Sequence, residues 1–233
     1  MVNNWFNIIQ DYLLPPTCIL CGDPGLGSQD ICRACFNDMQ KNIHCCYRCA
    51  ETFETANKTP QLCGHCLSKS PAFDETYAPY LHQDTIRHLI ATLKFNRKYK
   101  NARVLGYLLA THIKKTAELP DIIIPVPLHT QRYKERGFNQ STEIAKTISK
   151  RLNIPIDTKS CIRQRNTLHQ IDLPAKQRHK NIKNAFEVIR QIDAQHIAIL
   201  DDVMTTGSTV NELAKVLKKA GVTRIDVWVC ARA

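Results

Sequence analysis

Short apolar runs alternate along the second half of the chain with segments whose apolar residues recur at helical spacing. Residues 122–127 and 197–200 have the pattern of strands buried on both faces of a sheet. Helices are predicted after them, over 140–152 and from Val210 to the stop at Gly221, and a last strand over 223–230. Repeated strand–helix units predict an α/β domain with a mainly parallel sheet, flanking helices, and ligands at the carboxyl ends of the strands.

The remaining segments of this domain carry further predicted elements. An edge strand is expected over 77–81, then a helix capped by Asp84, a second helix through Lys115, and another strand near 159–162. Residues 128–137 are predicted to be a loop, and the polar segment 163–183 is long enough for a hood or mobile lid. Residues 1–16 have the spacing of a short amphipathic helix packed against the rest of the protein.

The N-terminal part of the chain is rich in cysteine and has few aliphatic residues. Four Cys-x-x-Cys pairs lie within it, and two such pairs supply the thiolates of one structural zinc site, whose metal would contribute much of the folding free energy. The simplest assignment is sequential, with one zinc bound by Cys18, Cys21, Cys32 and Cys35 and a second by Cys46, Cys49, Cys63 and Cys66. Interleaved pairs satisfy the same spacing, Cys45 could replace Cys46, and His44 and His65 are weaker alternatives.

Charge divides the chain at the same place. Residues 1–75 contain five Lys or Arg and eight acids, a net charge of −3, whereas the whole chain carries +11, which leaves +14 for residues 76–233. We therefore expect a zinc-ribbon module over 1–75 and a domain over 76–233 that handles polyanions. No secretory signal and no run of 18 apolar residues is found, so a cytoplasmic protein without a membrane-spanning helix is expected.

Asp201 and Asp202 directly follow the strand over 197–200, and the small residues Thr205–Thr209 come next. A turn of this kind before a helix offers backbone N–H groups to an anion, and Gly207 lets the backbone approach it closely. Two carboxylates beside an anion site suit a ligand with a phosphate and, one sugar away, vicinal hydroxyls: a ribose 5-phosphate. An ordinary strand–turn–helix joint, with Asp202 and Ser208 as turn and cap residues, is the alternative.

Two groups of cations lie elsewhere in the basic domain. The segment 128–137 carries His129, Arg132, Lys134 and Arg136 beyond the end of a strand, where they could neutralise a pyrophosphate. Lys94-Phe95, Tyr99 and the cations up to Arg103 could bind a nucleic-acid backbone and stack bases. A solvated helix–helix junction is the more common explanation for such a run.

These motifs together resemble those of the ComF family. The similarity lies in the four cysteine pairs, in the spacing from Arg163 to Phe186, and in four short motifs, Leu93–Phe95, Pro125–Leu128, Arg136–Gln140 and Leu200–Gly207. It covers nearly the whole chain, and Arg136–Gln140 is its most specific part. The resemblance implies a cytoplasmic bacterial protein with a zinc-finger module and a type I phosphoribosyltransferase-like domain, linked to natural transformation and single-stranded DNA; a related branch has a name tied to gluconate use.

Carried over by position, the family pattern implies roles in binding 5-phosphoribosyl-1-pyrophosphate (PRPP) with Mg²⁺. Asp201 and Asp202 would hold the ribose hydroxyls, and Arg132 and Arg136 would face the pyrophosphate. The 5-phosphate would lie against Thr205, Thr206, Gly207, Ser208 and Thr209. In an active enzyme Asp201, Asp202 and Arg136 would be the catalytic residues. Thr205 stands where purine-salvage relatives have an acid, so transfer to a purine base is not expected.

Three functional hypotheses follow. The leading one is a DNA-uptake protein that binds single-stranded DNA, works with competence-machinery proteins and retains a PRPP-type pocket. The second is an active phosphoribosyltransferase that acts on an unidentified acceptor. The third is a zinc-ribbon adaptor whose second domain is inert.

Overall fold

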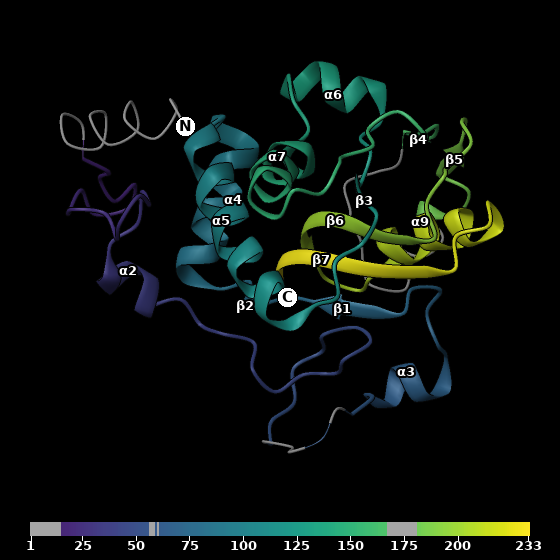
Figure 1. Cartoon of the computed structure of the whole chain (residues 1–233), viewed down its shortest axis with the longest axis horizontal. Helices are drawn as coiled ribbons and strands as arrows, with labels where there is room; N and C mark the ends of the chain where they lie inside the picture. Colours follow the sequence, from purple (N-terminus) through teal and green to yellow (C-terminus); the bar gives the residue numbers. More distant parts are fainter. Residues whose placement is uncertain (1–14, 56–58, 60, 167–180) are drawn as a thin grey trace.

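The computed structural model describes residues 15–55, 59, 61–166 and 181–233 (Figure 1). At its centre is a five-stranded sheet in the order β1 (Glu75–Tyr77), β7 (Arg224–Arg232), β6 (His196–Met204) and β3 (Ile122–Pro125), with β2 (Tyr80–Leu81) also paired to β7. All of these pairings are parallel. The predicted helix over 1–16 and most of the predicted lid over 163–183 lie outside the described residues.

Helices cover both faces of this sheet. One face carries α4 (Asp84–Asn96), α5 (Tyr99–Thr116) and α7 (Gln140–Leu152), and the other carries α9 (Ser208–Lys219). Along β6 the side chains alternate, so that Ala198 and Leu200 join the first layer while Ile197 and Ile199 join the second. The predicted fold class, a mainly parallel sheet with flanking helices, is confirmed.

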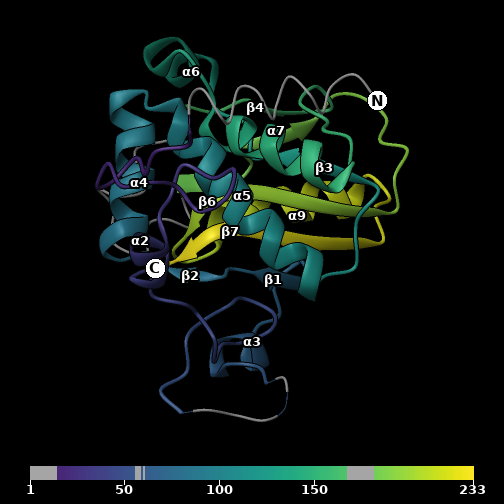
Figure 2. The ribbon, with the colours of Figure 1, turned by 60° about the vertical axis from the view of Figure 1, so that its left-hand side comes forward.

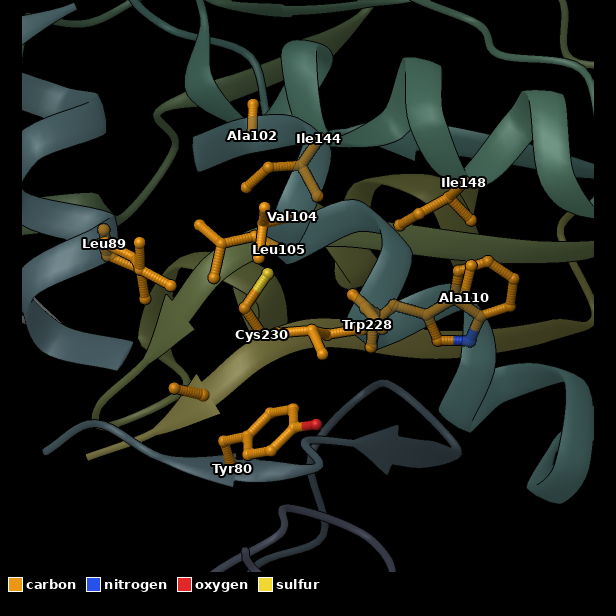
Figure 3. Packing of buried hydrophobic residues seen from close by; sticks show 14 of the residues in the cluster. Tyr80, Leu89, Ala102, Val104, Leu105, Ala110, Ile144, Ile148, Trp228 and Cys230 are labelled. Carbon is orange, nitrogen blue, oxygen red and sulfur yellow. The ribbon is translucent and has the colours of Figure 1, made fainter. Parts of the chain in front are cut away.

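The first layer packs around the large side chain of Trp228, on β7 (Figure 3). Leu105 and Ile144, from two different helices, belong to the same cluster as Trp228 and Cys230, and all of these side chains are almost fully buried. Helices α5 and α7 come close because position 106 is glycine: a Cβ there would lie 2.7 Å from Thr147 Cβ and 2.8 Å from Ile144 O. This contact fixes the two helices side by side (Figure 2).

Two elements depart from the predictions made for the middle of the chain. The strand near 159–162 was expected to continue the parallel sheet, but β4 (Cys161–Arg163) pairs antiparallel with β5 (Phe186–Val188) in a separate two-stranded sheet. Asp157 turns the chain away after one parallel bridge between Ile156 and Ile123, because its carboxylate accepts from two following backbone N–H groups. The predicted loop over 128–137 contains a helix, α6 (Thr130–Arg136).

The predicted edge strand and the cap of the following helix need smaller corrections. The edge strand is interrupted between β1 and β2 at Ala78 and Pro79, where Pro79 has no N–H to donate. Asp84 is the first residue of α4 and not its cap, and its carboxylate accepts from the side chain of Gln40.

The cysteine-rich module contains two short helices, α2 (Arg33–Asn37) and α3 (Gly64–Ser68), and packs against the edge of the sheet (Figure 1). Its backbone hydrogen-bonds to the edge strands: Thr76 N donates to Tyr47 O at 3.0 Å and Leu81 N to Gln40 O at 2.9 Å. Arg232, 8% exposed, donates to Cys49 O and Met204 O and forms an ion pair with Glu51. The module is therefore joined to the domain by polar contacts and also by apolar packing, since the buried Ile31 and Met39 belong to the first layer. The predicted division between residues 75 and 76 stays a prediction.

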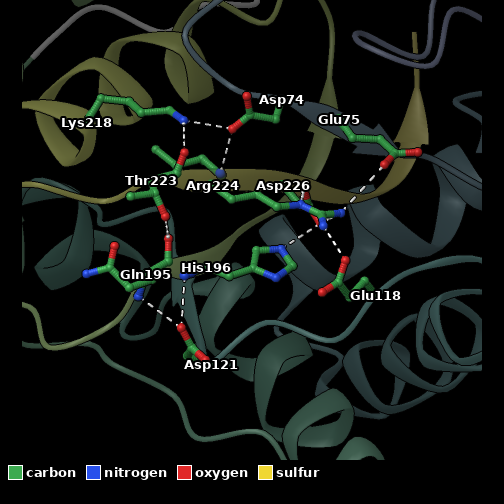
Figure 4. Close-up of polar contacts among 11 residues, drawn as sticks. Asp74, Glu75, Glu118, Asp121, Gln195, His196, Lys218, Thr223, Arg224 and Asp226 are labelled. Carbon is green, nitrogen blue, oxygen red and sulfur yellow. Dashed lines mark hydrogen bonds and ion pairs between the residues drawn. The ribbon is translucent and has the colours of Figure 1, made fainter.

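The amino ends of the central strands are joined by a network of charged residues (Figure 4). His196 and the fully buried Asp226 lie 2.8 Å apart, and Arg224 bonds to Asp226. The carboxylate of Asp121 accepts from two backbone N–H groups at the start of β6, and these hydrogen bonds lower its pKa. This end of the sheet is therefore occupied by its own side chains, whereas the carboxyl end is open.

Among the described residues, no helix combines the length and the apolar character needed to cross a membrane.

Candidate functional site

A cavity of about 260 Å³ lies at the carboxyl end of β6. Helix α4 forms one wall, and α6, the start of α7 and β4 contribute the others. The residues that line it include four acidic or hydroxyl groups from the predicted site and five cations: Asp201, Asp202, Thr205, Thr209, Arg87, Lys94, Arg132, Arg136 and Arg163. The cavity therefore brings together residues that the sequence placed on separate segments.

Asp202 lies deepest in this site, at 2% exposure. Its carboxylate forms an ion pair with Lys94 of α4 and accepts a hydrogen bond from Gln140 Nε2 at 3.2 Å. Burial alone would raise the pKa of Asp202, but the ammonium group of Lys94 and the Gln140 hydrogen bond hold that pKa below its usual value. Asp202 is therefore a charged, internally paired carboxylate, and a ligand hydroxyl would have to compete with Lys94.

Asp201 has the opposite electrostatic character. It is partly buried, accepts from Ser141 Oγ at 3.0 Å, and stands directly beside the charged carboxylate of Asp202. Burial and the neighbouring negative charge raise the pKa of Asp201 to about 7. Two adjacent acids thus differ in protonation state, an arrangement that separates a binding carboxylate from a group able to exchange a proton near neutral pH.

Three arginines face the two acids across the cavity. Arg132 and Arg136 come from α6, in the segment that the sequence predicted to be a loop, and Arg163 comes from β4. Burial lowers the pKa of Arg136, partly offset by both aspartates, and burial together with Arg132 lowers the pKa of Arg163 to about 10. Guanidinium groups keep their charge under such shifts, so this wall suits the oxygens of a phosphate or pyrophosphate.

The motif Arg136–Gln140 forms one continuous connection through the site. Gly137, at φ +82°, ends α6, and Phe138 packs against the Tyr99 ring with centroids 4.9 Å apart. Asn139 caps α7 by accepting from Ser141 N and also donates to Val126 O beyond β3. Gln140 accepts from Arg136 while donating to Asp202. Each residue of the motif therefore helps place a cation or an acid.

The turn after β6 matches the predicted anion loop in its backbone and differs in its side chains. Gly207 has φ +71° and precedes the first residue of α9, as the predicted close approach to a phosphate requires. Thr205 and Thr209 line the cavity, whereas Thr206, Gly207 and Ser208 do not. The hydroxyls of Thr206 and Ser208 lie 2.7 Å apart and bond to each other, and Ser208 is buried. These two hydroxyls would have to exchange partners to meet a phosphate.

Sequence reasoning missed several residues of the site. Lys94 belongs to the predicted basic cluster, but it forms an ion pair with Asp202; its position four residues after the buried Ile90, on the same side of α4, was the available signal. Arg163 is the first residue of the predicted lid and of the family spacing up to Phe186, but the sequence did not indicate it as a site residue. His82, whose pKa is lowered by burial and by Lys94, lines the cavity and carried no signal in the sequence.

The predicted basic cluster after Phe95 is split between different contacts. Phe95 is 67% exposed at the rim of the cavity, and Arg97 donates to Glu135 O. Arg103 forms an ion pair with Asp30 of the cysteine-rich module, and Tyr99 packs on Phe138. The cluster is therefore largely a junction between elements, which was the more common explanation.

The eight cysteines of the pairs form two groups in the described structure, as in the sequential assignment: Cys18, Cys21, Cys32 and Cys35, and Cys46, Cys49, Cys63 and Cys66. Within each group the sulfur atoms lie within 4.8 Å of one another, and three of the Sγ–Sγ distances are 3.5, 3.6 and 3.7 Å. Sulfurs about 2.3 Å from a tetrahedral zinc lie roughly 3.8 Å apart, so both groups fit structural Zn²⁺.

The alternative zinc ligands lie outside these groups. Cys45 Sγ is directed at Asn42 O, 4.0 Å away, and burial raises the pKa of its thiol. His44 and His65 are likewise not part of either group among the described residues. With four sulfurs each, both sites are closed, which is the arrangement of structural zinc.

Comparison with known proteins identifies the family of this chain. Residues 9–67 match the model of the double zinc ribbon domain. The DNA utilization protein YhgH of Shigella flexneri is 36% identical over 225 residues, covering 94% of this chain and 98% of that protein. Competence protein F of Haemophilus influenzae is 35% identical over 225 residues, covering 93% and 96%. The chain belongs to the ComF family.

The ComF assignment extends over nearly the whole chain, since these relatives cover both the ribbon module and the sheet domain. Among solved structures, a purine phosphoribosyltransferase from Pyrococcus horikoshii is similar over 57% of this chain and 73% of that chain, at 18% identity and a TM-score of 0.35. The predicted family and the predicted zinc-ribbon module are thus confirmed.

Proposed function

We propose that this ComF-family protein takes part in the utilisation of DNA taken up by the cell, and that its cavity binds PRPP or a closely related sugar phosphate. The names of the relatives, DNA utilization protein and competence protein F, support the first part. The second part depends on one observation: two aspartates and three arginines from separate segments converge on one cavity at the carboxyl end of the sheet.

The ligand would lie with its ribose between β6 and α4. Asp201 and Asp202 would accept from the two ribose hydroxyls, and Thr205–Thr209 would receive the 5-phosphate at the start of α9. The pyrophosphate would face Arg132 and Arg136, and Arg163 adds a third guanidinium to that wall. Mg²⁺ would accompany the pyrophosphate and neutralise part of its charge.

Binding of the sugar requires a rearrangement around Asp202. The ammonium group of Lys94 now occupies the place where a ribose hydroxyl would donate. Because Lys94 also lines the cavity, a small rotation of its side chain would exchange the carboxylate for a ligand phosphate. Lys94 would thus keep a negative partner in both states, which lowers the cost of releasing Asp202.

The same cavity could support catalysis, and the raised pKa of Asp201 favours this second candidate. A pyrophosphate displaced from the anomeric carbon would leave toward the arginine wall, whose charge is fixed before the reaction begins. Asp201, with a pKa near 7, could accept a proton from an incoming nucleophile. Thr205 provides no carboxylate at the position that purine-salvage enzymes use, so the acceptor is of another kind.

The DNA-handling role includes binding of single-stranded DNA in the cytoplasm, together with other proteins of the competence machinery. Phe95, exposed at the rim of the cavity, is a surface on which a base could stack. A reducing compartment would keep the eight zinc-binding thiols available to the metal.

Calorimetric titration with PRPP and Mg²⁺ tests the proposed pocket. We expect saturable binding by the unaltered protein and at least a hundredfold loss in the double variant Asp201→Asn/Asp202→Asn. Asp193→Asn, a change at an exposed carboxylate before the amino end of β6, is the control and should bind normally. Equal affinity of the unaltered protein and the double variant would reject the pocket. Release of pyrophosphate from bound PRPP separately tests catalysis.

A further inference from the structure

A second cavity, of about 780 Å³, lies in a groove along α5 and α7. Ser28 and Gln29 of the first zinc ribbon form its third wall. None of the residues lining this groove lines the candidate sugar-phosphate site, so the two cavities are separate.

The groove is lined by six cations and by no acidic residue. The cations come from both helices: Arg103, Lys114, Lys115, Lys146, Lys150 and Arg151. Two of them are neutralised, Arg103 by Asp30 and Lys146 by Glu143. Lys114, Lys115 and Lys150 are exposed and form no ion pair with any described residue. A positive surface without local compensation therefore lies within a concave site.

Helical spacing arranges these side chains in two rows. On α5, Arg103, Tyr107, Thr111 and Lys115 follow one another at intervals of four residues, and on α7 Lys146 and Lys150 do the same. From Arg103 to Lys115 the row extends over roughly 18 Å. The close contact at Gly106 keeps the two rows near each other. Such a track of fixed cations is suited to a repeating anion rather than to a single phosphate.

Stabilisation of helix ends explains only part of this pattern. Lys114, Lys115, Lys150 and Arg151 lie in the last turns of α5 and α7, where cations are favoured by the helix dipole. Arg103 and Lys146 lie outside those turns. In the last turn of α9, by contrast, Lys218 is bound to Asp74 and to Thr223 O, as a purely structural cation would be.

We propose that this groove binds the phosphate backbone of single-stranded nucleic acid. The proposal rests on the proposed DNA-handling function and adds the surface that would hold the strand. The groove, with a volume of about 780 Å³, is large enough for a short length of one strand. Tyr107 also lines the groove, and the Arg151 guanidinium lies over its ring, 4.3 Å from the centroid, which holds this cation within the groove.

Fluorescence anisotropy with a labelled 20-nucleotide oligo-dT, measured at several salt concentrations, tests this assignment. We expect Lys114→Glu/Lys150→Glu to weaken binding at least tenfold at 0.1 M salt. Loss of two phosphate contacts should also reduce the slope of log affinity against log salt by roughly 1.4. Lys114→Arg/Lys150→Arg keeps the charge and should bind within twofold of the unaltered protein.

The matched control is Lys215→Glu/Lys219→Glu, which makes the same change of charge on exposed or partly exposed positions of α9. Retained binding by this control supports the groove, whereas equal weakening of both double variants would show a response to overall charge and overturn it. Normal binding by Lys114→Glu/Lys150→Glu would also overturn it. PRPP titration of the same variants separates the two sites, because the groove variant Lys114→Glu/Lys150→Glu should bind PRPP normally. If the unaltered protein does not bind PRPP, the proposed pocket is rejected, and the proposal for the groove is unaffected.

Discussion

The ammonium group of Lys94, on α4, forms an ion pair with the carboxylate of Asp202, at the end of β6, inside the candidate site. The pair is almost fully enclosed, and Gln140 adds a hydrogen bond to the same carboxylate. The contact therefore joins a helix of one layer to the end of the central strand. It also keeps Asp202 charged beside Asp201, whose proton affinity is raised.

Replacing Lys94 by Met should destabilise the protein in a pH-dependent way. Without Lys94, burial would raise the pKa of Asp202, so the variant buries an unpaired carboxylate at neutral pH but a neutral carboxylic acid once the pH falls below that raised pKa. We expect a loss of about 3–5 kcal/mol at pH 7, typical of a buried pair that loses one partner, and a smaller loss near pH 4. Urea unfolding at both pH values measures it. Lys146→Met, which breaks the exposed pair with Glu143, should cost under about 0.5 kcal/mol, and a pH-independent loss for Lys94→Met would contradict the ion-pair explanation.

The variant Asp201→Asn should become more stable than the unaltered protein as the pH rises. The folded protein holds the Asp201 proton up to about pH 7, whereas the unfolded chain releases it near pH 4. In the unaltered protein the free energy of unfolding therefore falls as the pH rises across this interval. The variant Asp201→Asn lacks this decrease because asparagine does not titrate.

We expect the advantage of Asp201→Asn to grow to about 1–4 kcal/mol between pH 4 and pH 7 and then to remain constant. Thermal unfolding of both proteins over pH 4–8 is the measurement, and the comparison cancels the pH dependence of zinc binding. An advantage that is the same at every pH would indicate that Asp201 has an ordinary pKa.

Adjacent cysteines should differ sharply in their effect on zinc content. Cys46 belongs to the second four-sulfur group, whereas Cys45 is directed away from it. We expect about two zinc ions per chain in the unaltered protein and in Cys45→Ser, and about one in Cys46→Ser. Metal analysis of the purified proteins decides this, and loss of zinc from Cys45→Ser would reopen the ligand assignment.

Arg232 should be more important for stability than its ion-pair partner Glu51. Arg232→Met removes a donor from Cys49 O and one from Met204 O, which keeps its hydrogen bond from Ala233 N; we expect a cost of about 1–3 kcal/mol. Glu51→Gln affects a carboxylate that is 53% exposed and should cost under about 1 kcal/mol. Unfolding of the two variants under the same conditions compares them. Equal costs would show that the ion pair, and not the carbonyl contacts, joins the ribbon to the sheet.

Gly106→Ala should disturb the packing of α5 on α7. The new methyl group would lie 2.8 Å from the backbone oxygen of Ile144, which has little freedom to move, and we expect a loss of about 1–3 kcal/mol in spite of the better helix propensity of alanine. Gly64→Ala, where a methyl group meets no atom within 4 Å, is the control and should be neutral or slightly stabilising. Thermal unfolding separates the two results.

The hydrophobic pattern was sufficient for the sheet and most helices because it reflects burial directly. The strand over 197–200 lies in β6 with both faces covered, and the helix over 140–152 coincides with α7. The site residues Asp201 and Arg136 were likewise found because parallel strands place their carboxyl ends at one edge. The family resemblance supplied their proposed roles.

Features that depend on contacts between distant segments could not be obtained in this way. The short strand β4 has the same local pattern as a strand of the main sheet, and only its partner β5, beyond the segment 167–180, determines where it pairs. The partnership of Lys94 with Asp202 and that of Arg103 with Asp30 join residues 73 or more positions apart. Local spacing in the sequence does not show which distant acid a basic residue will meet. Lys94 and Arg103 therefore could not be distinguished from exposed basic residues by the acids that they pair with.

The central position of β7 affects how the protein is made. Its neighbours β1, β2 and β6 are all synthesised before it. The carboxylate of Asp74 accepts a hydrogen bond from Ile225 N, which follows 151 residues later in the chain. All eight cysteines of the two sulfur groups precede the strands of the sheet in the chain, so both groups can bind metal before β7 is synthesised. Until β7 is inserted, β1 and β6 lack their shared partner, and unpaired strand edges of this kind are prone to aggregation.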